Sequence, residues 1–445
     1  MDLRNLLLRV ALGAFCSILS LLICLIPIPR KLADLQRSSF DLIFLTVFAL
    51  SRIFLFFFAF FLLHQKPHGD LVAFYLPEAH KVLHGLVPYR DFQSSYAPLN
   101  PYLDALLLRI HNSPLSIVVF QIACDIASIP FWIGFLRRFL AENTLRRSAL
   151  LYLVQPLLLW GTAIDGKNHA CISLLLAITL FALARKEIVS GIAYSLSIVV
   201  VKILPLMFLP TLFLGSRKRL KWALSALSLT LLVYLGFVLY GADVTVPLRF
   251  EGSLATSGDL PYFWAYLSGH SIPGIVSGAV TLLGVGVAVV FLSWAQIRVP
   301  SGPGRSRILS DGILLLLITL LLLSKKSDPI YLTMCLFPLC AFTSMQMETG
   351  RRWMAYPYAM LTFLGLPISS FFFWPLRHAD GVRLHEMLLG GSRNAWLMAI
   401  AQPLLLASYA VFIVRICQEL LHLSHSARPH SRLSADPAEQ ALGNS

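Results

Sequence analysis

Residues 51–63 read SRIFLFFFAFFLL, and two further stretches, residues 222–240 and 313–323, are equally apolar. A helix that is hydrophobic around its whole circumference belongs in lipid or in the centre of a large bundle. One soluble core has no room for several such segments. The sequence therefore predicts a protein that crosses a membrane many times.

The composition of the 445-residue chain supports this prediction. Hydrophobic residues make up 57% and charged residues 13%, against roughly 45–50% and 25% in soluble domains. These proportions exclude a disordered chain and a coiled coil, and they argue against a soluble enzyme. The predicted fold class is an all-α polytopic membrane protein.

The net charge of +14 arises from 36 Lys and Arg against 22 Asp and Glu. The basic residues form short clusters between apolar segments and no stripe interleaved with aromatic residues. They therefore indicate membrane topology and attraction to anionic lipid, and no nucleic-acid partner is expected. The seven cysteines lie in or beside apolar segments without a CxxC pair, so they indicate neither a disulfide framework nor a zinc site.

Hydropathy predicts about 12–13 membrane segments. They lie at about 6–28, 41–63, 114–136, 148–163, 168–185, 188–203, 204–215, 222–241, 271–294, 309–325, 329–345, 353–373 and 394–417. One set of the connecting loops holds about twice as many Lys and Arg as the other, and the positive-inside rule makes that richer set cytoplasmic. This orientation requires residues 188–215 to form a hairpin of two half-length helices, opened near Lys202 and Pro205.

The domain organisation follows from these segments. Residues 1–40 are predicted to form an additional membrane helix and a cytoplasmic linker, and residues 41–417 the transmembrane domain. The longest outer loop, residues 64–113, is expected to contain short helices. Residues 418–445 are polar and contain Ser and Pro, which predicts a disordered cytoplasmic tail.

The outer loop at 64–113 carries the densest polar and aromatic chemistry. It contains Asp70, Tyr75, the segment GLVPY at residues 85–89 and the segment SYAPL at residues 95–99. The order D…Y…A…G-x-x-P-Y…Y-x-P-L after a membrane helix resembles the lipid-linked-sugar glycosyltransferases of the GT-C superfamily. It is most similar to the bacterial polyprenol-phosphate-mannose-dependent mannosyltransferases (glycosyltransferase family 87), and more distantly to the catalytic subunits of GPI mannosyltransferase I.

Three later stretches extend the resemblance to about residues 60–340. Residues 165–168 (DGKN) resemble the G-Q-x-N element of the family, with Lys167 in place of Gln. The run from Gly191 to Pro205 is similar to its G…K-x-x-P segment. Residues 327–331 (SDPIY) resemble its late S-P…Y stretch.

The resemblance implies a GT-C-like helical bundle and a hexosyltransferase. The enzyme would move a hexose, mannose above all, from a polyprenyl-phosphate carrier to an extracytoplasmic glycan or glycolipid, with inversion at the anomeric carbon. The resemblance assigns Asp70 the role of general base, which a positioned carboxylate can perform. Asp is also a good helix N-cap, and one residue can serve both purposes. Because the carrier phosphate is itself the leaving group, no nucleotide-binding loop or other cofactor is expected. No cluster of ligand residues in the sequence indicates a metal site.

A phosphate leaving group needs positive charge aimed at it. Four lysines map near the outer ends of membrane segments and are candidates for this role, with snorkelling side chains as the alternative: Lys167, Lys202, Lys325 and Lys326. Six other residues are candidates for contact with the sugar or the acceptor: Tyr75, Tyr89, Asp91, Tyr96, Asn168 and His169. Asp125, inside a membrane segment, is expected to be structural, with Arg52 as an eligible partner.

Two other functions remain open on the sequence. A transporter or lipid-linked oligosaccharide flippase would show inverted repeats and charged residues at the bilayer midplane. An O-antigen ligase or polymerase would centre on a long late outer loop. The glycosyltransferase interpretation places a multi-pass protein in the inner or plasma membrane, with its active site on the extracytoplasmic side.

Overall fold

The computed structural model describes residues 3–183, 185–253, 258–270, 272–299, 302–324, 327–368 and 381–426. Within these ranges the regular elements are helices, apart from one isolated bridge between Pro88 and Phe92. Eight of the described helices are long and apolar enough to cross a membrane. The prediction of an all-α polytopic membrane protein is confirmed.

Long apolar helices and shorter ones build the bundle together. The long ones are α1 (Leu3–Leu25), α3 (Arg37–Phe57) with η1 (Phe58–Leu62), α6 (Leu115–Leu136), α12 (Arg219–Leu239), α15 (Gly274–Arg298), α16 (Pro303–Leu323), η5 (Pro329–Cys335) with α17 (Leu336–Glu348), and α21 (Arg393–Ser426). The shorter ones are α7 (Glu142–Leu153), α8 (Pro156–Ala163), α9 (His169–Ala182), α10 (Glu187–Leu196), η3 (Ser197–Val201), η4 (Leu204–Phe208), α11 (Leu209–Gly215) and α18 (Ala355–Ile368). The connections hold α2 (Arg30–Ala33), η2 (Leu71–Tyr75), α4 (Leu76–Leu83), α5 (Asn100–Ile110), α13 (Val246–Ser253), α14 (Leu260–Ser268), η6 (Arg352–Met354) and α20 (Gly381–Leu389).

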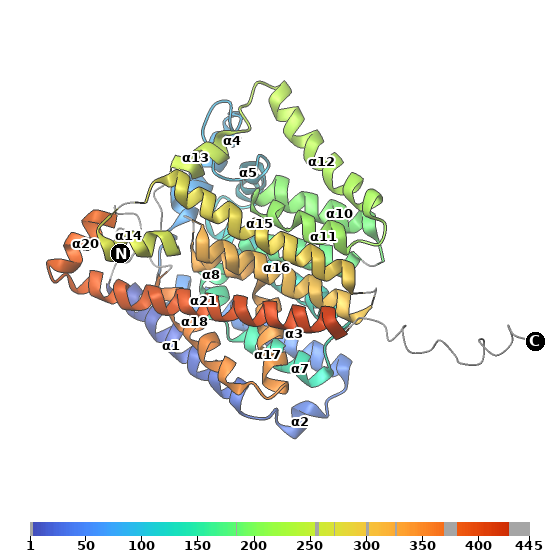
Figure 1. Ribbon diagram of the computed structural model, residues 1–445. Coiled ribbons are helices and arrows are strands. Elements are labelled where there is room, and N and C mark those ends of the chain that lie inside the picture. The colour runs from blue at the N-terminus through green and yellow to red at the C-terminus, as the bar shows by residue number, and fades with distance from the viewer. Residues whose placement is uncertain are drawn as a thin grey trace, which may run out of the picture.

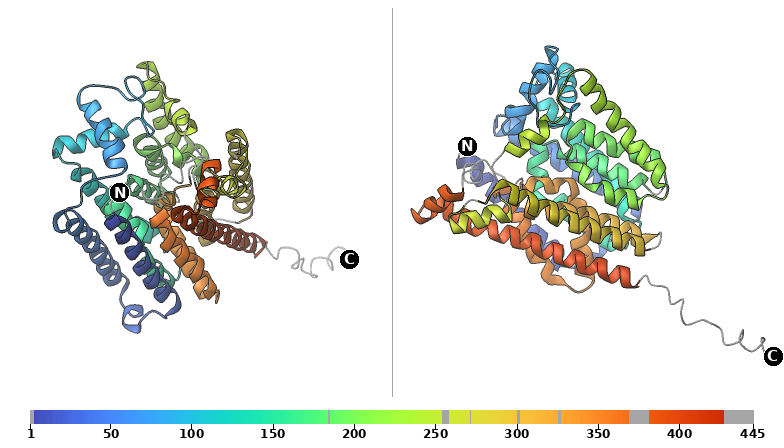
Figure 2. Two further views of the ribbon diagram at one scale, coloured as in Figure 1. Left: turned by 90° about the vertical axis from the view of Figure 1, so that its left-hand side faces the viewer. Right: turned by 45° about the horizontal axis from the view of Figure 1, so that its top comes forward.

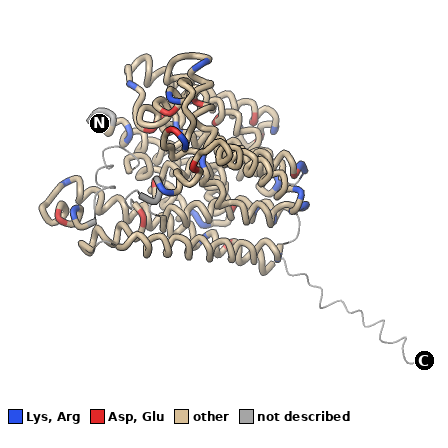
Figure 3. The backbone as a smooth tube through the Cα atoms, turned by 90° about the horizontal axis from the view of Figure 1, so that it is seen from above, with Lys and Arg blue, Asp and Glu red and all other residues tan. Residues whose placement is uncertain are grey.

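The bundle has two distinct ends. We call the end that carries residues 63–114 the loop end; Figure 1 shows its helices α4 and α5 close to α13. We call the other end the basic end; there α6 and α9 finish and α16 begins, so that Arg138, Leu183 and Pro303 line one cavity. Most of the tube in Figure 3 is tan, which means that charged residues are sparse in the described chain.

The predicted hairpin within residues 188–215 is present. Helices α10 and η3 run toward the loop end, Lys202 turns the chain with extended backbone angles (φ −154°, ψ 153°), and η4 and α11 return. Arg185, which precedes the hairpin, and Gly215, which ends it, line the same cavity at the basic end. The chain therefore enters and leaves this hairpin at one end of the bundle.

The first helix is an integral part of the bundle. α1 packs along α18, and the two helices lie side by side in Figures 1 and 2. Ser17 Oγ donates to the carbonyl of Ala359 at 3.1 Å. A Cβ added to Gly13 would lie 3.2 Å from the carbonyl oxygen of Phe363, so glycine permits this close approach. The predicted extra N-terminal helix is thus built into the transmembrane domain.

A buried ion pair joins α3 to α6. Arg52 Nε lies 3.3 Å from Asp125 Oδ2, both side chains are fully buried, and Tyr152 donates to the other carboxylate oxygen at 3.1 Å. The pairing predicted for Asp125 is therefore confirmed. Removing one member would leave an uncompensated charge in the bundle, which is far more costly than losing the pair.

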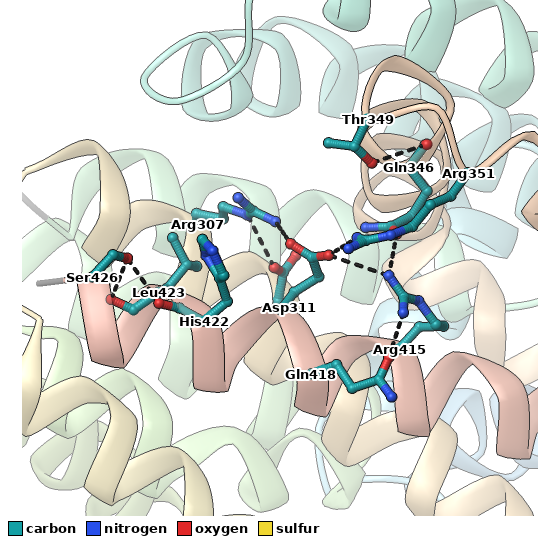
Figure 4. A network of polar contacts seen from close by, with 11 residues as sticks. Arg307, Asp311, Gln346, Thr349, Arg351, Arg415, Gln418, His422, Leu423 and Ser426 are labelled. Carbon is teal, nitrogen blue, oxygen red and sulfur yellow. Dashed lines mark hydrogen bonds and ion pairs between the residues drawn. The ribbon is translucent and has the colours of Figure 1, made fainter.

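At the basic end, Glu419 of α21 forms ion pairs with three arginines, which Figure 4 labels as Arg307, Arg351 and Arg415. It accepts from Arg307 of α16 at 2.8 Å, from Arg415 at 3.4 Å and from Arg351. Helix α21 continues to Ser426, and Glu419 and Leu420 within this last part are buried. The disordered tail predicted from residue 418 is therefore wrong at its start, and residues 427–445 lie outside the described residues.

Cysteine labelling tests the orientation of the two ends. Gln93 is exposed at the loop end and Lys218 at the basic end. Six native cysteines are buried, and a Cys417→Ser background removes the half-buried one. In intact cells we expect Gln93→Cys to react with a membrane-impermeant thiol reagent, and Lys218→Cys to react only after permeabilisation, because Lys and Arg favour the cytoplasmic side. The opposite pattern would contradict the predicted orientation.

Candidate functional site

A cavity of about 230 Å³ lies at the loop end, and we call it the Asp70 cavity. Six charged or titratable side chains line it: Arg9, His68, Asp70, Asp165, Lys167 and Asp328. They come from α1, from the first loop, from the connection between α8 and α9, and from the start of η5. The fold thus brings together polar residues that are far apart in the sequence.

Asp70 is held by Lys167 and faces this cavity. It occupies the N-cap position of η2, but its side chain makes no capping hydrogen bond to the described backbone. Instead Lys167 Nζ donates to Asp70 Oδ2 at 2.6 Å, and 25% of the Asp70 side chain is exposed. Burial favours the neutral acid, yet Lys167 and Lys202 outweigh it and lower the pKa of Asp70 below its ordinary value of 3.8. Asp70 is therefore a carboxylate at neutral pH.

Asp165 has a different environment. It pairs with Arg9 at 3.3 Å and with His68 at 3.0 Å, and Trp160 Nε1 donates to it at 3.0 Å. Burial opposes ionisation, but Arg9 and His68 hold the pKa of Asp165 well below its usual range. Asp165 raises the pKa of His68 in turn, although burial of the imidazole lowers it. Asp165 therefore anchors the start of α1 and the first loop, and Asp70 is the carboxylate with fewer partners.

Lys202 stands at the tip of the hairpin, close to the Asp70 cavity. Its Nζ lies 5.0 Å from the ring centroids of both Tyr96 and Tyr331, a distance typical of cation–π contacts. Within the described residues it has no ion pair, although Asp70 and Asp328 are near enough to act on its charge. The ammonium is thus held by aromatic faces, and no described carboxylate is in contact with it.

The hairpin tip is joined to the SYAPL segment of the first loop. Ala97 N donates to Val201 O at 3.2 Å, and Leu99 N donates to Val199 O at 3.0 Å. These backbone bonds place the ring of Tyr96 beside Lys202. The two sequence motifs that suggested a site therefore meet in space.

Three more predicted residues lie near this group. The rings of Tyr75 and Tyr96 are 5.1 Å apart, and Asn168 N donates to Tyr75 Oη at 3.4 Å. His169 packs edge-on against Tyr331 at 4.9 Å. Lys167 and Asn168 directly precede α9, which begins at His169, and so all three lie at the loop end.

The other predicted residues lie elsewhere. Tyr89 donates to the carbonyl of Tyr96, but its ring packs 6.2 Å from Phe237 of α12 and does not line the Asp70 cavity. Asp91 closes a surface turn by accepting from Val87 N at 2.8 Å and pairing with Arg90. Lys325 and Lys326 lie outside the described residues.

Sequence reasoning did not assign Arg9, His68, Asp165 or Asp328 to the site. For Arg9 there was a signal, since a charged residue inside the first apolar helix needs a partner. His68 and Asp165 are almost a hundred residues apart, and nothing local links them. Within the described residues no group of three His, Cys, Asp or Glu side chains is placed to hold a metal ion.

No protein-family model, curated protein or solved structure matches this chain. The argument for function therefore depends on the geometry of the Asp70 cavity and its surroundings.

A second acidic group, Glu78 of α4, lies in the same loop. It is buried and accepts from Ser94 Oγ at 2.7 Å. Burial raises its pKa from 4.5 to about 7, although Ser94 and Lys81 lower it. The folded protein thus holds a proton on Glu78 that the unfolded chain has already released, and this makes folding less favourable as pH rises through that interval.

Glu78→Gln removes this titration and keeps the shape of the side chain. Between about pH 5 and pH 7.5 we expect the variant to lose less thermal stability than the wild type, because it has no proton to release. Melting temperatures at both pH values measure the effect. Glu348→Gln, at an exposed position, is the control and should follow the wild type. Equal pH dependence in all three proteins would contradict the assignment.

Proposed function

We propose that this chain is an integral-membrane glycosyltransferase of the GT-C type. It transfers a hexose such as mannose from a polyprenyl-phosphate carrier to an extracytoplasmic glycan or glycolipid acceptor. The observation that carries the proposal is the ionised Asp70 carboxylate, which faces a cavity at one end of a membrane bundle beside Lys167 and Lys202.

Asp70 is the general base of the proposed reaction. The acceptor hydroxyl gives its proton to Asp70 as its oxygen attacks the anomeric carbon, and the bond from that carbon to the carrier phosphate breaks. Attack from the face opposite the phosphate inverts the anomeric centre, so a β-linked donor yields an α-glycoside. A base in this role must be ionised when the acceptor arrives, and the low pKa of Asp70 meets that requirement.

Lys202 and Lys167 provide positive charge for the departing phosphate. Lys202 is fixed between Tyr96 and Tyr331 and makes no described ion pair, so its charge is available to an incoming anion. Preorganised charge of this kind stabilises a leaving group without reorganisation at the moment of reaction. The cavity of about 230 Å³ is smaller than the roughly 300–1,000 Å³ of pockets for drug-sized ligands. It suits a sugar and a phosphate, while the polyprenyl chain stays in the bilayer.

The rival functions predict other arrangements. A transporter of the inverted-repeat type binds its substrate near the bilayer midplane, whereas Asp70, Lys167 and Asp328 line a cavity at one end of the bundle. Purified protein given a panel of labelled polyprenyl-phosphate sugars separates the alternatives. The proposed enzyme consumes the carrier-linked sugar when an acceptor is present, whereas a flippase moves the intact lipid between leaflets.

Asp70→Asn tests the general base. The amide keeps the size of the side chain and can still accept from Lys167, so we expect normal folding and a loss of transfer of about 10²–10⁴-fold. Asp91→Asn, an exposed carboxylate of the same loop, should keep wild-type rates. Steady-state transfer kinetics and melting temperatures are the measurements. Activity of Asp70→Asn within a few-fold of wild type would show that Asp70 is not the base.

Lys202→Met tests the leaving-group charge. It keeps an apolar stem of similar length, so folding should be unchanged or slightly improved. We expect a higher KM for the donor together with a lower kcat, because charge builds on the phosphate in the transition state. The KM for the acceptor should hardly change. Lys81→Met is the control, since Lys81 also lies 5.0 Å from an aromatic ring, that of Phe92, but does not line the cavity. Normal donor kinetics in Lys202→Met would place the phosphate elsewhere.

A further inference from the structure

A second and larger cavity, of about 420 Å³, lies at the basic end of the bundle. Four arginines line it: Arg138 after α6, Arg185 before α10, Arg217 before α12 and Arg305 in α16. Its volume is in the range of ordinary ligand pockets. We call it the arginine cavity, and the proposed sugar transfer at the loop end does not use it.

Among the described residues, no carboxylate forms an ion pair with the charges in this cavity. None of the four arginines has an ion pair within the described residues. Arg138 experiences the positive charge of Arg185, and Arg305 that of Arg217. The contrast with the neighbouring cluster is clear, since Arg307, two residues beyond Arg305, pairs with Glu419 at 2.8 Å. Four like charges around one hollow attract an anion from outside the chain.

Two of the arginines are fixed in position by helix ends. Arg138 donates to the carbonyl of Leu180 at 3.4 Å and to that of Phe181, in the last turn of α9, and its guanidinium lies 5.4 Å from the Phe181 ring centroid. Arg305 donates to the carbonyl of Leu214 near the end of α11. The Nε of Arg305 is buried and has no partner among the described residues. These two side chains are therefore preorganised, and one donor is unused.

The other two arginines are exposed and lie at the two ends of the hairpin. Arg185 and Arg217 have no side-chain hydrogen bond among the described residues, so both can turn toward a ligand. Apolar side chains complete the wall, namely Leu180, Leu183 and Leu309. The lining at this basic end of the bundle combines guanidinium groups and leucines. Such a lining suits an amphiphile with an anionic head.

We propose that the arginine cavity binds the phosphate headgroup of an anionic membrane lipid. Arg138 and Arg305 form the fixed part of the site, and Arg185 and Arg217 close on the headgroup from the surface. Basic pockets between membrane helices on the cytoplasmic side are suited to such lipids, because the anionic lipids of that leaflet attract Lys and Arg. A bound lipid would also join both ends of the hairpin to α6 and α16. It would thereby stabilise the hairpin, which carries Lys202 at its tip.

The test uses the purified full chain in a neutral detergent. It is titrated with short-chain phosphatidylglycerol, with phosphatidylcholine of the same chain length, and with inorganic phosphate. Bound lipid is counted by native mass spectrometry, and stability is followed as the melting temperature. We expect phosphatidylglycerol to bind and to raise the melting temperature, with little effect from phosphatidylcholine or inorganic phosphate.

The principal variant is Arg185→Gln/Arg217→Gln, which removes the two exposed charges without breaking a described contact. It should weaken phosphatidylglycerol binding at least about tenfold, given the strength of Lys and Arg attraction to anionic lipid. Arg30→Gln/Lys31→Gln removes the same charge from exposed positions of α2 and should bind as the wild type does. The second variant, Arg138→Gln/Arg305→Gln, removes the two fixed charges. Its bound phosphatidylglycerol is counted on the folded protein only, and it should also fall.

Three results would overturn the proposal. Equal weakening in the α2 control would mean that surface charge alone attracts the lipid. A full effect of inorganic phosphate would mean a site for a free anion. Unchanged phosphatidylglycerol binding in both arginine variants would mean that the lipid binds elsewhere.

Discussion

A charge inside a membrane bundle is costly without a partner, and the arrangement of this protein depends on that constraint. Arg52 joins α3 to Asp125 of α6, and Arg9 joins α1 to Asp165. Glu419 joins α21 to the start of α16 and to the segment after α17. Apolar packing discriminates weakly between helix neighbours in lipid, because lipid tails are as apolar as leucine. The ion pairs therefore do much to specify which helices meet.

The exceptions to this pairing are informative. Within the described residues, Lys202 and the four arginines of the arginine cavity have no carboxylate in contact. They lie at opposite ends of the same hairpin, Lys202 at its tip and Arg185 and Arg217 at its two ends. Both ends of the hairpin thus carry positive charge that is available to anions from outside the chain. The proposed donor phosphate and the proposed lipid headgroup are two such anions.

Much of the fold follows from the sequence, because hydropathy, proline and charge act locally. The hairpin was predicted from Pro205 and the charge of the flanking loops, and the Arg52–Asp125 pair from the cost of a lone intramembrane charge. The partners of Asp165 were not predicted, because Arg9 is 156 residues away and only the packing of α1 on α18 brings it there. The positions of Tyr89 and Asp91, away from the Asp70 cavity, depend on how the first loop folds, and no residue pattern specifies that fold. The resemblance to GT-C enzymes stays a prediction.

The Asp70–Lys167 pair suggests how the proposed reaction could be ordered. With Lys167 at 2.6 Å, Asp70 is ionised but a weak base, since the same contact that lowers its pKa lowers its affinity for a proton. Burial lowers the pKa of Lys167, but Asp70, Asp165 and Asp328 outweigh it, so Lys167 stays charged and can turn toward another anion. In the proposed mechanism Lys167 moves from Asp70 to the donor phosphate. The proton affinity of Asp70 rises as its own contact with Lys167 weakens. Asp70 then becomes an effective base only once a donor is bound, which would protect the site from proton uptake before the sugar is in place.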